Sequence, residues 1–124
     1  MLEKLIIDSK EDTPKVIFDP ASRIFEISAR SLPENAIGFY EPVLIWLNNY
    51  TQSPIDLTVF EFKLEYFNTS SAKQLAKILL ILENMAKKNK VVINWFYKKE
   101  DADMLASGTR FSKLIDLNFN LIEY

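Results

Sequence analysis

Residues 56–67, D-L-T-V-F-E-F-K-L-E-Y-F, constrain the fold more than any other stretch of this chain. Successive side chains of a β-strand point to opposite faces, and this stretch alternates accordingly. Its even positions are apolar or aromatic: Phe60, Phe62, Leu64 and Tyr66. Its odd positions are charged: Glu61, Lys63 and Glu65. A strand between two helix layers would be apolar on both faces, so we expect a sheet with helices mainly on one face.

The other strand-like segments indicate how this sheet is built. Short apolar or alternating runs between turn residues predict strands at 3–8, 15–19, 23–30, 91–97 and 118–124. The first three are joined by links too short for a crossover, so we expect them to pair antiparallel. The later strands alternate with helices, which predicts parallel strands with right-handed crossovers.

Apolar residues at helical spacing predict three helices. The first includes Phe39 to Tyr50, and Pro42 must lie in its first turn or kink it, because proline has no backbone N–H to donate. The second covers 70–88 and has the most regular apolar stripe. The third begins in the acidic stretch 100–107, Gly108 is expected to end or break it, and F-S-K-L-I at 111–115 continues with helical character. The predicted fold is a single α/β domain over residues 1–124, with a mixed sheet that is antiparallel in its N-terminal part.

Composition excludes several classes of function. The net charge is −2, and no basic surplus marks a nucleic-acid binder. Trp95 and Tyr97 could stack on bases from one strand face, but no basic groove accompanies them, so packing is expected. The chain has no Cys and no His, which removes thiol chemistry and the commonest general base and metal ligand. The N-terminal apolar run is too short for a signal peptide or membrane helix, so we expect a cytoplasmic protein.

Two further patterns have simple explanations beside their chemical ones. Ser70 and Lys73 have the S-x-x-K spacing that can place an amine near a serine hydroxyl, but the other motifs of such enzymes are missing. Glu100, Asp101 and Asp103 could be metal ligands, yet they lack the glycine and the spaced oxygens of a calcium loop. Acids in the first turn of a helix favour its dipole, which is the expected role of this group. We therefore expect no catalytic residue, cofactor or metal.

The tetrapeptide Asn68-Thr69-Ser70-Ser71 lies between the strand at 56–67 and the second helix. Each of these side chains can accept a backbone N–H at a helix start, so one of them is expected to be the cap. One cap does not need three hydroxyls. An exposed hydroxyl at a helix N-terminus also suits a phosphoryl group, because the dipole and the unpaired N–H groups stabilise an anion. The residues alone leave both interpretations open.

The chain resembles two related groups of bacterial regulators, one at residues 68–71 and the other over most of its length. A strand that ends in a hydroxyl cluster before an amphipathic helix resembles the STAS domains of anti-sigma factor antagonists, in which a Ser at that place is phosphorylated. The more extensive resemblance is to the SiaC-type regulatory phosphoproteins, a family with a STAS-like fold. Five segments in order carry it: P-E-N at 33–35, L-E-Y-F-N-T-S-S at 64–71, W-F-Y at 95–97, D-A-D-M-L-A-S-G at 101–108, and the final F-N-L-I-E. The chain departs from the family in two places. Pro42 interrupts the first helix, and Ala106 stands where the family often has Glu.

The SiaC resemblance implies that Thr69 is a phosphoacceptor and not a catalyst. In the best understood members a Ser/Thr kinase phosphorylates this position and a PP2C-type phosphatase reverses it. The unphosphorylated form binds and activates a diguanylate cyclase, which raises cyclic di-GMP. The resemblance further implies partner contacts by the neighbouring polar residues: Asn68, Ser70, Ser71 and Lys73.

Other functions remain open at this level. The STAS resemblance would make the chain an anti-sigma factor antagonist that acts on an anti-sigma kinase, so that transcription is its output. A plain structural subunit is a further alternative. The Glu61/Lys63/Glu65 face is either an extension of a docking surface or an ordinary solvated sheet face.

Overall fold

Strands and helices follow one another along residues 2–124 in the predicted order. This computed structural model describes residues 2–124. The strands are β1 (Leu5–Ile7), β2 (Lys15–Asp19), β3 (Ile24–Ser31), β4 (Leu57–Phe67), β5 (Lys90–Tyr97) and β6 (Asn118–Glu123). The helices are α1 (Ala36–Tyr50), α2 (Thr69–Met85) and α3 (Ala102–Leu114).

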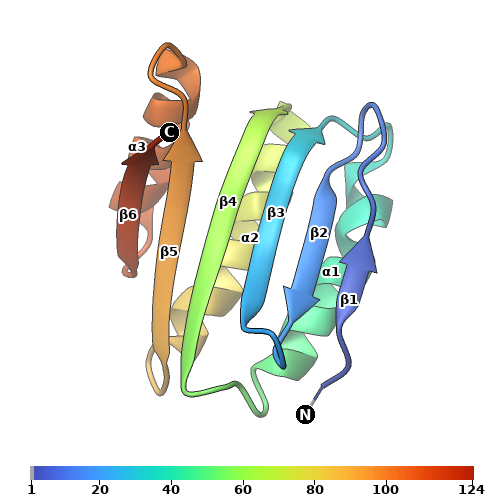
Figure 1. The fold of residues 1–124 in the computed structure, drawn as a ribbon, viewed down its shortest axis with the longest axis vertical. Coiled ribbons are helices and arrows are strands. Elements are labelled where there is room, and N and C mark those ends of the chain that lie inside the picture. The colour runs from blue at the N-terminus through green and yellow to red at the C-terminus, as the bar shows by residue number, and fades with distance from the viewer. Residues whose placement is uncertain (1) are drawn as a thin grey trace.

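The six strands form one mixed sheet in the order β1-β2-β3-β4-β5-β6. β1 and β2 pair antiparallel, as do β2 and β3, whereas the remaining neighbours are parallel. All three helices lie behind the sheet in Figure 1, and the face toward the viewer is left open. The predicted fold class is therefore confirmed. Because β3 to β6 all point the same way, the end of β4 and the start of α2 lie at the upper edge of the view.

The core fills the space between the sheet and the helices. Val91, Ile93 and Trp95 of β5 are buried on the helix side, while the intervening residues are only half-buried. Aromatic rings continue this layer, and Trp46 stacks on Tyr50 with ring centroids 5.2 Å apart. The alternation that the sequence shows is thus the alternation between the covered face and the open face of the sheet.

Helix α1 begins earlier than predicted, and this changes the place of Pro42. Asn35 caps the helix, because its Oδ1 accepts a hydrogen bond from the backbone N of Gly38 at 3.0 Å. Pro42 therefore lies in the helix interior, beyond the first turn. Its missing N–H leaves the carbonyl of Gly38 without the usual bond. Both residues are exposed, so water can satisfy that carbonyl.

The prediction that Tyr66 shares the buried face of β4 is wrong. The register between β3 and β4 shifts between Ala29 and Arg30, so Glu65 has no partner on β3 and the strand contains a bulge. Ala29 adopts a positive φ of 70° there, in the left-handed region. Beyond the bulge Tyr66 is 47% exposed and the Arg30 guanidinium lies 5.5 Å from its ring centroid. Phe67 packs against the core instead.

The prediction that Gly108 ends or breaks the third helix is also wrong. α3 continues through Gly108 to Leu114. Gly108 is buried against β5, and a Cβ added there would lie 2.5 Å from Trp95 Cδ1. The glycine is therefore needed for the close approach of a helix to an aromatic ring, and its backbone conformation is ordinary.

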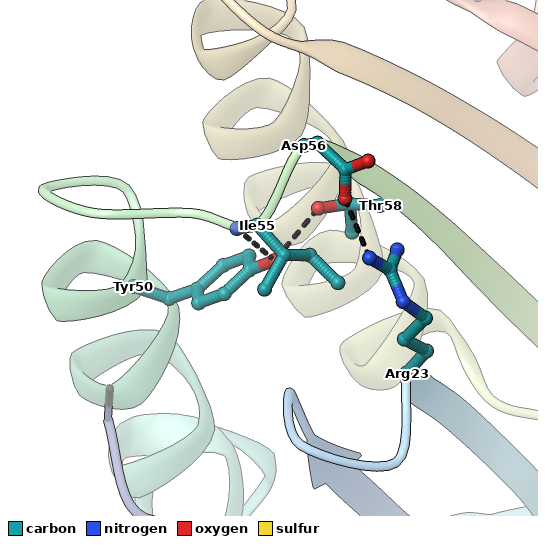
Figure 2. A network of polar contacts seen from close by, with 5 residues as sticks. All are labelled: Arg23, Tyr50, Ile55, Asp56 and Thr58. Atoms are coloured by element: carbon teal, nitrogen blue, oxygen red, sulfur yellow. Dashed lines mark hydrogen bonds and ion pairs between the residues drawn. The ribbon is translucent and has the colours of Figure 1, made fainter.

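A polar network fixes the start of β4, at the edge opposite to α2's first turn. The Tyr50 hydroxyl at the end of α1 lies 2.8 Å from Thr58 Oγ1 and accepts a bond from the Ile55 backbone N at 3.2 Å. Figure 2 shows this phenol reaching from α1 to the link, with Arg23 paired to Asp56 beside it. The hydrogen bond and charge of Arg23 lower the pKa of Asp56, although both groups are exposed. The network holds the link that precedes β4 against the end of α1.

Candidate functional site

Asn68, and none of the three hydroxyl residues that follow it, caps α2. Asn68 Oδ1 accepts a hydrogen bond from the Ser71 backbone N at 2.9 Å, and the Asn68 carbonyl accepts one from Ala72 N. Its extended backbone, with φ −88° and ψ 175°, is typical of a cap residue. Thr69 and Ser70 are therefore not needed as caps.

Ser71 is turned into the protein and joins three elements. Its Oγ donates to the Ser31 carbonyl at 2.9 Å and accepts from Ser31 Oγ at 2.8 Å. Ser31 Oγ also lies 2.6 Å from the Tyr40 hydroxyl of α1. Both serines are completely buried. Ser71 thus holds α2 against β3 and α1, and its buried hydroxyl does not fit the expected contact with a partner.

The direction of these hydrogen bonds requires a protonated Tyr40. Each hydroxyl has one proton, and that of Ser31 is donated to Ser71. The Tyr40 hydroxyl must therefore donate to Ser31. Burial raises the pKa of Tyr40 to about 12, against a smaller lowering by the Ser31 hydrogen bond. The first turn of α2 is consequently anchored by a network of uncharged hydroxyl groups at neutral pH.

Thr69 and Ser70 are both exposed at the first turn of α2. Within residues 2–124, neither hydroxyl has a hydrogen-bond partner, and neither does the backbone N–H of Thr69 or Ser70. Such N–H groups at a helix N-terminus, together with the helix dipole, stabilise an anion placed beside them.

Thr69 differs from Ser70 in what lies next to it. A groove of about 310 Å³ runs between residues 67–76 and residues 107–114, and we call it the α2–α3 groove. Thr69, Lys73 and Arg110 all line it, whereas Ser70 does not. The sequence analysis does not single out Arg110, because no local pattern shows that an arginine of the third helix lies beside Thr69.

The other chemical candidates differ in their surroundings. Ser70 and Lys73 are exposed, and no hydrogen bond joins them in the described chain. Asp101 caps α3 by accepting a bond from Met104 N at 2.9 Å, and Asp103 lies in the first turn. No group of three or more carboxylates within residues 2–124 is arranged to hold a metal ion. Trp95 is completely buried and therefore offers no stacking surface for bases.

The charges on the open sheet face are paired with one another. Lys63 Nζ lies 3.5 Å from a Glu26 oxygen and 3.7 Å from a Glu61 oxygen, and 4.9 Å from the centroid of the Phe96 ring. Glu65 is displaced from this group by the bulge. No helix in the described chain is long and apolar enough to cross a membrane.

Comparison with known proteins gives one family. The model of the SiaC family of regulatory phosphoproteins matches residues 7–124. An uncharacterised protein of Pseudomonas aeruginosa (strain UCBPP-PA14) is 27% identical over 104 residues, which is 81% of this chain and 80% of that protein.

Solved structures share the fold over nearly the whole chain. SiaC of Pseudomonas aeruginosa superposes with a TM-score of 0.89 and 22% identity, covering 99% of this chain and 100% of that one. A chain of the crystal structure of the diguanylate cyclase SiaD in complex with its activator SiaC, also from Pseudomonas aeruginosa, gives a TM-score of 0.90 and 22% identity. That match covers 97% of this chain and 99% of that one. At such identities the likeness is one of fold.

Proposed function

Because this chain belongs to the SiaC family of regulatory phosphoproteins, we propose that it is a non-enzymatic signalling module switched by reversible phosphorylation of Thr69. A Ser/Thr kinase adds the phosphoryl group and a PP2C-type phosphatase removes it. The unphosphorylated form binds and regulates an effector protein. Since the kinase uses ATP, the module works in the cytoplasm, and it needs no cofactor of its own.

The observation that carries this proposal is the position of Thr69. Of the three hydroxyl residues between β4 and α2, Ser71 is buried and Ser70 does not line the groove, whereas Thr69 is exposed and lines it. A phosphoryl group on Thr69 would add about −1.5 to −2 charges beside unpaired N–H groups and near Lys73 and Arg110. The protein can accommodate this charge without unfolding, because Asn68 and Ser71 hold the helix start.

We propose a diguanylate cyclase as the effector, so that the output is cyclic di-GMP. The support is that SiaC of Pseudomonas aeruginosa, which shares this fold, activates the diguanylate cyclase SiaD and forms a complex with it. A partner fitted to the neutral hydroxyl would have to desolvate a dianion after phosphorylation, which is costly. The phosphorylated form is therefore released.

Mass spectrometry of the protein from its native host, with and without phosphatase treatment, tests the switch. We expect a phosphoryl group on the peptide that contains Thr69, lost in Thr69→Ala and retained in the matched variant Ser70→Ala. An unmodified protein under several growth conditions, also untouched by a cognate kinase in vitro, would refute the switch.

Cyclase assays test the effector. The unphosphorylated chain should raise the activity of a cognate diguanylate cyclase, and Thr69→Glu should not. Binding to an anti-sigma kinase in place of a cyclase would refute this effector and favour the anti-sigma antagonist function, with the same switch residue.

A further inference from the structure

The α2–α3 groove is apolar along its length. Its carbon-rich lining comes from both helices and the end of β4: Phe67, Ala72, Ala76, Phe111 and Leu114. Leu114 is 76% exposed, the largest exposed fraction among the exposed large hydrophobic side chains of residues 2–124. Covering this leucine and the neighbouring apolar lining with a partner would remove apolar area from water, which is favourable.

The dimensions of the groove suit a helix of another molecule. Its α2 wall extends from Thr69 to Ala76 and its α3 wall from Ser107 to Leu114. Each wall therefore spans about 10 Å, or two helical turns, at 1.5 Å per residue. α2 packs closely against α1 but makes little contact with α3, so the groove stays open. The alanines of the α2 wall allow a partner backbone to approach closely.

The floor of the groove is rigid before anything binds. The rings of Phe67 and Phe111 pack against Trp95, with centroid distances of 6.0 Å and 5.5 Å. Trp95 is itself fixed, because its Nε1 donates to the Met104 carbonyl at 3.0 Å. A preformed surface loses little conformational entropy on binding, which favours affinity.

The rim of the groove is positively charged and unpaired. Lys73 and Arg110 are exposed on opposite walls. Neither forms an ion pair with any carboxylate in the part of the chain that the structure describes. Arg110 only donates to Ser107 Oγ at 3.2 Å. This contrasts with the open sheet face, where Lys63 is already paired with glutamates. The groove therefore complements a negatively charged partner.

We propose that the α2–α3 groove binds an amphipathic helix with acidic flanks, presented by the effector. Leucine-like residues at positions i, i+3 or i+4, and i+7 enter the groove, and the acidic residues meet Lys73 and Arg110. A phosphoryl group on Thr69 opposes this binding, because it sets a dianion at one end of the groove and attracts the two cations the acids need. The regulatory part rests on the proposed function; the groove itself does not.

Two synthetic peptides of the same length test the groove on the unmodified full chain. Both carry leucines at i, i+4 and i+7 on a helical backbone, one with glutamate flanks and the other with lysine flanks. Binding is followed by amide chemical shifts of the isotope-labelled protein. We expect the acidic peptide to shift residues 67–76 and 107–114 and the basic peptide to bind at least about tenfold more weakly, a difference of 1.4 kcal/mol.

Paired variants locate the contacts. Arg110→Glu and Leu114→Asp should each weaken the acidic peptide by about tenfold or more. Lys113→Glu and Leu80→Asp are the matched controls, since these exposed residues of α3 and α2 lie outside the groove, and they should leave binding within about twofold. Four outcomes would each overturn the groove assignment. Both peptides could bind equally, or neither could bind up to the solubility limit. The chemical-shift changes could be confined to the open sheet face, or the variants and the controls could lose the same peptide affinity.

Thr69→Glu separates this inference from the proposed function. It should weaken the acidic peptide and leave the basic peptide unaffected or bound more tightly. If the acidic peptide binds the groove but Thr69 is never phosphorylated in the host, the groove stands and the switch fails. If Thr69 is phosphorylated but the peptide never enters the groove, the switch stands and this inference fails.

Discussion

Ser71→Ala should destabilise the protein while the same change one residue earlier, Ser70→Ala, should not. Ser71 Oγ is buried and takes part in two hydrogen bonds with Ser31, whereas Ser70 is exposed. In Ser71→Ala the Ser31 carbonyl keeps its bond from Asn68 N at 3.1 Å. The Ser31 hydroxyl proton, however, loses its acceptor in a site closed to water.

The expected cost follows from that one unsatisfied group. A buried donor without a partner costs about 1–3 kcal/mol. The entropy of unfolding for 124 residues is about 0.26 kcal/mol/K, so about 2 kcal/mol lowers the melting temperature by about 8 °C. Ser70→Ala should stay within about 0.5 kcal/mol of the wild type.

Urea unfolding of the three proteins measures this difference directly. The midpoint of Ser71→Ala should fall with an unchanged slope, because the surface exposed on unfolding stays the same. Wild-type stability in Ser71→Ala, or an equal loss in Ser70→Ala, would show that the hydroxyl network does not anchor α2. Ser71 would then have no structural role that distinguishes it from Thr69.

Three further perturbations have outcomes that the structure fixes. The pKa of Tyr40 is raised from 10.0 to about 12 in the folded protein. The stability that this shift contributes is complete below pH 10 and is lost by about pH 12. In alkaline unfolding curves the free energy of unfolding of the wild type should therefore fall by about 2–3 kcal/mol over this range, and that of Tyr40→Phe should not show this fall. Gly108→Ala gains about 1 kcal/mol of helix propensity but forces a Cβ against the fixed Trp95 ring. We therefore expect the free energy of unfolding to fall by about 1–2 kcal/mol and the tryptophan fluorescence to change. A stabilised variant would contradict the close packing. Asn68→Ala should cost about 0.5–2 kcal/mol through the lost cap, measured by thermal unfolding, and an unchanged melting temperature would exclude Asn68 as the cap.

The errors in the predicted fold share one physical origin. Strand alternation placed Tyr66 in the core, and turn chemistry placed an end or a break at Gly108, where α3 is continuous. Both rules describe a segment by itself. The bulge at Glu65 depends on how β4 pairs with β3, and the path of α3 through Gly108 depends on the room beside Trp95.

The sequence by itself determined the order of the elements, the side of the sheet that the helices cover and the seam at 68–71, because periodicity and capping chemistry are local properties of the chain. The sequence could not show which of residues 68–71 is the cap, which is buried and which is exposed to a partner. The packing of β3, α1 and α3 around the start of α2 makes Asn68 the cap and Ser71 the buried link to Ser31 and Tyr40. The same packing leaves Thr69 as the exposed hydroxyl beside an apolar groove with a cationic rim. Burial and hydrogen bonding depend on neighbours that are distant in sequence, and only the tertiary structure supplies those neighbours.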